Sequence, residues 1–176
     1  MAFYGSGHIT PDLIMHAVDE TNKYAHFHME NIAKKHNKYW KDTNYTEMKA
    51  FFGMLIIMGV SKRHSLDEYW SNSKYLRCDG IASVMTRNRF QIILRYFHLA
   101  DPADDPRVQD PETKRTFRQE QPLYKNQNWL NVITENCQTN FIVGREICLD
   151  EGMVRYKGRC KFKQRIPTKP DQTEMV

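Results

Sequence analysis

Apolar residues recur at intervals of three and four along most of the first 140 residues, and this spacing predicts helices. The first predicted helix begins at Thr10, whose hydroxyl can cap the free amides, and extends to Ala33. A second runs from Thr46 to about Met58. Its residues are so uniformly apolar that we expect it to be buried on nearly all sides.

Three further helices are predicted beyond these two. Ser65 and Glu68 have the spacing of a capping box, which predicts a short helix through Trp70. Another begins near Thr86, and the last runs from about Leu123 to Phe141. The predicted apolar stripe of the helix near Thr86 is Phe90, Ile93, Leu94 and Phe97. That of the last helix is Leu130, Ile133, Cys137 and Phe141.

Between these two helices lies a polar segment, residues 101–118, with three prolines and no hydrophobic period. Such a composition predicts a mobile loop. Large aromatic residues at helical spacings are expected to be core residues and not platforms for stacked bases. They are Phe51, Phe52, Trp70, Phe90 and Trp129.

After Gly144 the period changes from that of a helix to that of a strand. Residues 146–150 are predicted to form a short buried strand that ends at Asp150. Beyond it every odd position from 155 to 165 is basic, which would place the charges on one face of extended chain. We call this set the basic row: Arg155, Lys157, Arg159, Lys161, Lys163 and Arg165. The predicted fold class is therefore mainly α with a small C-terminal β part.

The charge of the chain is concentrated in the same segment. The formal net charge is +5, and residues 151–176 carry seven Lys or Arg against three Asp or Glu, a net of +4. A row of cations suits the phosphates of a nucleic-acid backbone and would release counterions on binding. The alternative is a solvated edge strand, because basic edges also discourage aggregation.

Three other charged residues allow two interpretations each. Asp150, at the end of a predicted strand, could hold a divalent ion or could merely cap a turn. Arg87 and Arg89, near a helix N-terminus, could grip phosphate or pair with acids such as Asp79 or Asp101.

Several classes of protein have no support in the sequence. No secretory signal is evident in these residues, and we expect no membrane span because no apolar run reaches about 20 residues. The four cysteines are widely spaced, which disfavours a structural zinc site. Phosphate-binding glycine loops, dinucleotide fingerprints and the serine-hydrolase elbow are absent, so no small-molecule substrate is indicated.

Several motifs, in order along the chain, resemble the piggyBac transposase family of the DDE/DDD superfamily, and animal proteins derived from such transposable elements. The resemblance covers roughly residues 10 to 170. The matching segments are 51–60, Glu68-Tyr69-Trp70-Ser71, 85–90, 93–98, 149–153, Lys157-Gly158-Arg159 and 166–170.

The resemblance implies a domain division and a chemistry. Residues 1–142 would form the family's helical dimerisation and DNA-binding domain, and 143–176 the first strand and hairpin of its RNase H-like catalytic domain. Asp150 would be the first of about three aspartates that bind Mg²⁺ or another divalent metal in the complete family. The later aspartates have no counterpart here, so we expect no cofactor for this chain, which is a truncated form of the family pattern.

The functional hypothesis that follows is a nuclear DNA-binding or self-associating fragment without autonomous transposition. Its expected partners are duplex DNA, a second copy of the chain or a full-length transposase, with no membrane. The alternative is a protein-interaction module, or a decayed transposon fragment with no retained activity.

Overall fold

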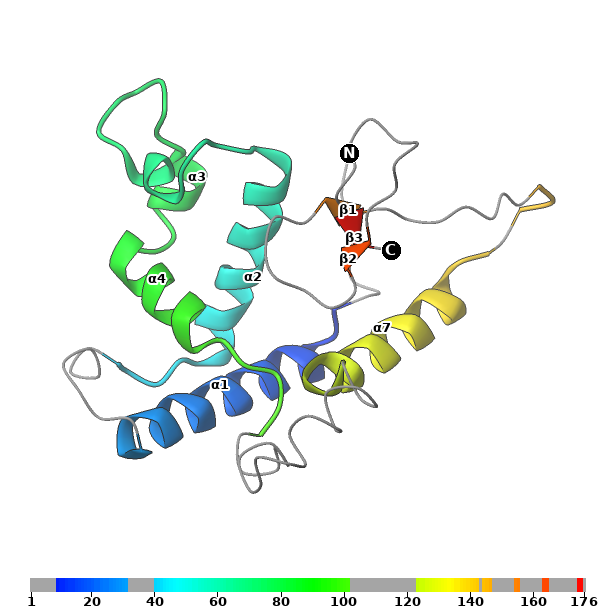
Figure 1. Ribbon diagram of the computed structural model, residues 1–176. Coiled ribbons are helices and arrows are strands. Elements are labelled where there is room, and N and C mark those ends of the chain that lie inside the picture. Colours follow the sequence, from blue (N-terminus) through cyan, green and yellow to red (C-terminus); the bar gives the residue numbers. More distant parts are fainter. Residues whose placement is uncertain are drawn as a thin grey trace. The chain divides into compact units, whose positions relative to one another are not determined.

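A computed structural model of the chain describes residues 9–31, 40–101, 123–142, 144–146 and three two-residue strands. This part of the chain is mainly helical, as predicted (Figure 1). The chain divides into two compact units, Met1–Asn140 and Phe141–Val176. No helix in the described ranges is both long and apolar enough to cross a membrane.

The first helix, α1 (Pro11–Asn31), begins where the sequence predicts. The hydroxyl of Thr10 accepts a hydrogen bond from the Leu13 amide at 3.3 Å, which caps the first turn. The predicted continuation to Ala33 lies outside the described residues. One stripe of α1 enters the core, with Leu13, Ile14, Ala17, Val18 and Ala25 all buried.

The second helix, α2 (Tyr45–Val60), starts at Asn44, whose side chain accepts the Glu47 amide at 3.0 Å. The prediction that this helix is buried on nearly all sides is wrong. The helix contacts α1, and only one stripe of it is buried, namely Met48, Phe51 and Met54. Three apolar residues of its C-terminal turns are exposed: Ile56 by 60%, Ile57 by 41% and Val60 by 86%.

The connection between α2 and the next long helix contains two short helices. The first, η2 (Leu66–Trp70), is a 3-10 helix at the predicted position. The second, α3 (Asp79–Ala82), was not predicted from the sequence pattern. The predicted capping box is not formed. The side chain of Ser65 makes no capping hydrogen bond, and Glu68 instead accepts the amide of His64 at 3.3 Å. A 3-10 turn is wound more tightly than an α-helical turn, which changes the positions that a cap must reach.

The fourth α-helix, α4 (Arg87–Tyr96), has the predicted cap, since the Thr86 hydroxyl accepts the Arg89 amide at 3.4 Å. The predicted stripe needs one correction. Leu94 is 44% exposed and Tyr96 is buried instead. Each residue turns a helix by about 100°, so Leu94 points well away from the buried Ile93.

The aromatic residues predicted for the core are packed together. The ring of Phe90 lies 5.1 Å from that of Phe51 and 5.4 Å from that of Trp70, and Phe52 lies 5.4 Å from Trp129. Such ring pairs stabilise beyond the area they bury. The prediction that these residues form a core is confirmed.

The last helix of this unit, α7 (Gln127–Asn140), follows a 3-10 turn, η3 (Tyr124–Asn126). Its buried residue is Trp129, whose indole donates to Nδ1 of His16 on α1 at 3.2 Å. The predicted stripe is correct only at Ile133, which packs against the core. The other three members, Leu130, Cys137 and Phe141, are exposed.

The second unit contains three short strands: β1 (Val154–Arg155), β2 (Lys163–Gln164) and β3 (Glu174–Met175). They form one antiparallel sheet in the order β1-β3-β2. The central strand β3 was not predicted. The predicted strand at 146–150 is described only at Glu146, which has no regular structure. The assignment of this unit to an RNase H-like domain stays a prediction.

Candidate nucleic-acid interface

The structure describes the backbone at two of the six positions of the basic row. Arg155 lies in β1 opposite Glu174 of β3, and Lys163 lies in β2 opposite Met175. Both therefore belong to one small sheet, although they lie 8 residues apart in the sequence. The prediction that the row shares one face is wrong for these two positions, because their partners are consecutive residues of β3 and consecutive residues alternate between faces. The remaining members of the row are outside the described residues, so their role stays a prediction.

Metal ligation by Asp150 also remains a prediction, because that residue lies outside the described part of the chain. Among the residues that the structure describes, no group of three His, Cys, Asp or Glu is placed to hold a metal ion. Cys78 and Cys137 are free thiols.

Arg89, one of the two predicted phosphate-binding residues of α4, is engaged inside the protein. Its Nε and Nη2 atoms donate to the two carboxylate oxygens of Glu47 on α2, each at 2.6 Å. The guanidinium carbon also lies 5.3 Å from the ring centroid of Trp40. The two charged side chains are only 18% and 24% exposed, so this ion pair fixes α4 on α2 and is not open to a ligand.

The carboxyl group of Glu47 responds to this arrangement. Burial alone would raise the pKa of Glu47, but the hydrogen bonds and the positive charge of Arg89 outweigh it and lower the pKa below its ordinary value. The ion pair is therefore fully charged at neutral pH.

Arg87, the second predicted residue of α4, lies at the surface. Its Nη1 is 3.4 Å from a carboxylate oxygen of Asp67 on η2, and Gln91 donates to the same oxygen at 3.3 Å. The side chains of the pair are 48% and 61% exposed. Both contacts are long and solvated, and ion pairs of this kind contribute little. The sequence left open whether these arginines pair with acids, and both do, but with Asp67 and Glu47.

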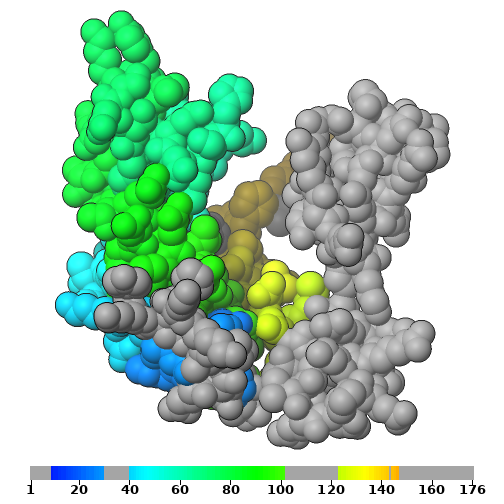
Figure 2. All heavy atoms as spheres, turned by 60° about the vertical axis from the view of Figure 1, so that its left-hand side comes forward, coloured from blue at the N-terminus to red at the C-terminus, as the bar shows by residue number. Residues whose placement is uncertain are grey.

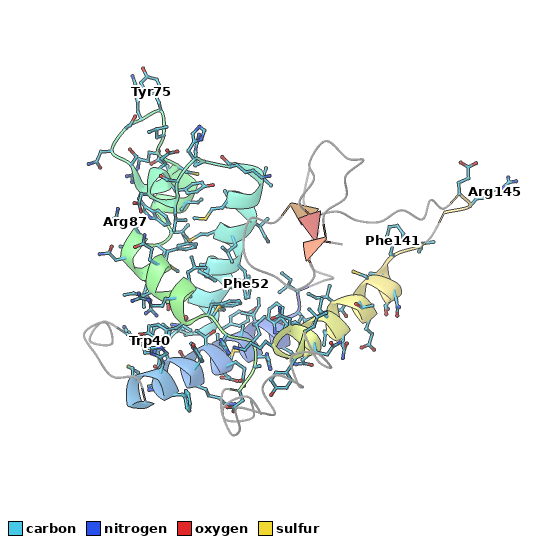
Figure 3. All side chains as sticks on the ribbon, in the orientation of Figure 1. Trp40, Phe52, Tyr75, Arg87, Phe141 and Arg145 are labelled. Carbon is cyan, nitrogen blue, oxygen red and sulfur yellow. The ribbon has the colours of Figure 1, made fainter. Side chains whose placement is uncertain are left out.

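Four exposed side chains form what we call the outward face of α4: Arg87, Asn88, Gln91 and Arg95. They lie opposite the stripe of Phe90, Ile93 and Tyr96 that α4 buries. Figure 3 shows Arg87 projecting from α4 on the side away from α2. Figure 2 shows α4, in bright green, on the surface that faces the viewer.

A surface depression lies along this face, lined by Asn88, Gln91, Ile92 and Arg95. The sequence analysis identified the charge near the start of the helix but did not identify Asn88, Gln91 and Arg95 as a set. A signal was present, because a wheel drawn from the buried residues Phe90 and Ile93 puts the three on the opposite side.

A family model described as Transposase IS4 matches residues 9–175, nearly the whole chain, and this match shows that the chain belongs to the class of the transposases. Human PiggyBac transposable element-derived protein 5 is 33% identical over 91 residues. That match covers 52% of this chain and 17% of the human protein. The chain belongs to the piggyBac-type transposase family.

A solved structure supports the same relationship in three dimensions. It is a cryo-EM structure of the piggyBac transposase synaptic complex with hairpin DNA, matched with a TM-score of 0.74 at 25% sequence identity. The match covers 95% of this chain and 32% of the transposase chain. The chain thus spans about a sixth and a third of the lengths of these two relatives.

Proposed function

We propose that these 176 residues bind duplex DNA through its phosphates and do not carry out transposition by themselves. The observation that carries the proposal is the basic row, in a segment with a net charge of +4, in a chain of transposase family. Duplex DNA carries a dense row of phosphates, so alternating cations release condensed counterions when they bind it. Phosphate contacts carry no sequence information directly.

The described strands fix the positions of two members of the basic row in the sheet. β1 and β2 flank β3 on either side, so Arg155 and Lys163 are held on strands that are both paired with Glu174-Met175. Neighbouring strands lie about 4.8 Å apart, so the two outer strands are separated by about 10 Å. Arg155 is paired with Glu174 and Lys163 with the next residue, Met175, so these two positions of the basic row share a sheet but fall on opposite faces of it.

The family also suggests the organisation of the chain and its surroundings. In this proposal residues 1–142 act as a helical dimerisation and DNA-binding domain, and 143–176 as the start of an RNase H-like domain. The nucleus is the proposed location, and a second copy or a full-length transposase is the proposed protein partner. A solved relative is a synaptic complex with hairpin DNA, which is consistent with both kinds of partner.

The absence of catalysis is proposed because only Asp150 matches a metal-binding position of the family. Two-metal phosphodiester chemistry needs several carboxylates around ions about 3.5–4 Å apart. Incubation of the chain with supercoiled DNA and Mg²⁺ should give no more nicking than Asp150→Ala under the same conditions. Metal-dependent cleavage that Asp150→Ala abolishes would show that this part of the proposal is wrong.

The DNA-binding proposal is tested by fluorescence anisotropy with a labelled duplex over a range of salt. A triple variant with Arg159, Lys161 and Lys163 changed to Ala should bind more weakly and with a shallower salt dependence. Its matched control changes three exposed lysines of the helical unit, Lys49, Lys62 and Lys74, and so removes the same charge. Equal losses in the two triple variants would remove the basic row from the proposal.

A second candidate function is self-association through α2, and one observation favours it. Ile56, Ile57 and Val60 are exposed together on the last turns of this helix. Sedimentation velocity of the wild-type chain and of Val60→Asp would test this candidate. If the wild-type chain forms a dimer that Val60→Asp dissociates, and if it does not bind DNA, a protein-interaction module would be favoured over the DNA-binding proposal.

A further inference from the structure

We propose that α4 lies in the major groove of the bound duplex and that its outward face contacts base edges. This inference rests on the proposed function, and it adds sequence discrimination to binding that phosphate contacts alone leave nonspecific. The surface carries two cations, Arg87 and Arg95, so its charge complements DNA.

The geometry of α4 suits a groove. The helix has 10 residues, which at 1.5 Å per residue gives a rod about 15 Å long. The major groove, about 12 Å wide, admits one α-helix. Asn88, Gln91 and Arg95 are spaced by three and four residues and so share one side. They span roughly 10 Å along the axis, which corresponds to about three base pairs at about 3.4 Å each.

The chemistry of the outward face is that of base-pair discrimination. The amide side chains of Asn88 and Gln91 can each donate to and accept from one adenine edge. The guanidinium of Arg95 can donate twice to guanine. Ile92, which lines the same depression, offers an apolar contact of the kind made with a thymine methyl group.

The rest of the unit holds this helix in a fixed orientation. The Arg89–Glu47 ion pair attaches its first turn to α2, and Phe90 and Ile93 are fully buried beneath it. The contacts that Arg87 and Gln91 make to Asp67 are long and exposed, so DNA can replace them. Asp67 itself would repel phosphate, and Asp67→Asn should tighten binding about two- to fivefold.

The test is selection of bound duplexes from a pool with a randomised central segment, followed by sequencing. The wild-type chain should enrich a motif of about three base pairs, with roughly tenfold or greater discrimination at each contacted pair. A variant with Asn88, Gln91 and Arg95 all changed to Ala should still bind the pool but should enrich no motif. These positions are exposed, and Ala favours helix, so thermal unfolding should change little.

Two controls separate this inference from the proposed function. Lys49→Ala, which removes an exposed cation from α2, should keep the motif. The basic-row triple variant should bind every sequence more weakly but should still enrich the same motif. A wild-type chain that binds the pool without enrichment, or an α4 variant that enriches the same motif, would overturn the inference alone. A chain that binds no duplex at all would overturn the proposed function with it.

Discussion

Replacement of Arg89 by alanine measures how firmly α4 is attached to α2. The guanidinium makes two hydrogen bonds of 2.6 Å to Glu47, and both side chains are mostly buried. A hydrogen bond to a charged group contributes about 1.5–3 kcal/mol, and a buried charge left without its partner is costly. The contact with the Trp40 ring adds about 0.5–1 kcal/mol.

Because the pair retains some exposure to water, we expect Arg89→Ala to lower the free energy of unfolding by roughly 2–4 kcal/mol. With a urea dependence of about 2 kcal/mol per molar, the unfolding midpoint should fall by roughly 1–2 M. Urea unfolding of the full chain, followed by the helical circular dichroism signal, measures the shift. Arg95→Ala, an exposed position on the same helix, should change stability by less than about 0.5 kcal/mol. Equal shifts for the two variants would refute this account of the ion pair.

The pH dependence of Glu47→Gln tests the same ion pair independently. The pKa of Glu47 is lowered in the folded protein, so its contribution is complete above the ordinary carboxyl range. It is lost as pH falls through the lowered pKa. The wild type should therefore exceed Glu47→Gln in stability at neutral pH, and the difference should shrink as the pH falls below the ordinary carboxyl range. A difference that stays constant over this range would contradict the lowered pKa.

Three further substitutions test the packing and the caps of the helical unit by thermal or urea unfolding of the full chain. Phe90→Ala should lower the free energy of unfolding by about 3–5 kcal/mol because Phe90 is fully buried. Leu94→Ala should lower it by less than about 1 kcal/mol because Leu94 is exposed. Similar losses for the two variants would contradict the corrected stripe of α4. Tyr69→Phe removes hydrogen bonds of 2.7 and 3.3 Å to carbonyls at the end of α2 and should cost about 1–2 kcal/mol, and an unchanged midpoint would remove the hydroxyl from the account. Asn44→Ala removes the N-cap of α2 and should cost about 1 kcal/mol, whereas a stabilised variant would show that the cap is unimportant.

The parts of the fold that the sequence predicts are those governed by local periodicity and caps. Thr10 and Thr86 cap the helices that they were expected to begin, and Phe51, Phe90 and Trp129 are core residues. In each case a short-range signal, either a hydroxyl before a helix or an aromatic residue on a stripe, coincides with the final environment.

The errors arise where burial depends on what the rest of the fold supplies. The composition of α2 indicates a helix buried on all sides, yet Ile56 and Val60 lie on the side away from the buried stripe and are exposed. Likewise, apolar periodicity alone cannot tell whether Leu94 or Tyr96 meets the neighbouring helices. Tertiary packing decides both questions, and periodicity does not contain it.

Only part of the candidate interface could be predicted, because the pairing of charged residues also depends on tertiary packing. A row of like charges is visible in the sequence, whereas pairing with an acid distant in sequence is not. Glu47 precedes Arg89 by 42 residues, and only the packing of α4 on α2 brings the two together. The outward face of α4 becomes recognisable once the buried stripe has been located.

The most direct test of DNA binding is the dependence of affinity on salt. For the wild-type chain on a duplex, the logarithm of the association constant should fall linearly with the logarithm of salt concentration. If the six cations of the basic row each neutralise one phosphate, the slope should be about −5, and the triple variant should reduce its magnitude by about 2.7. An association constant that does not change with salt would contradict the proposed contacts to phosphate.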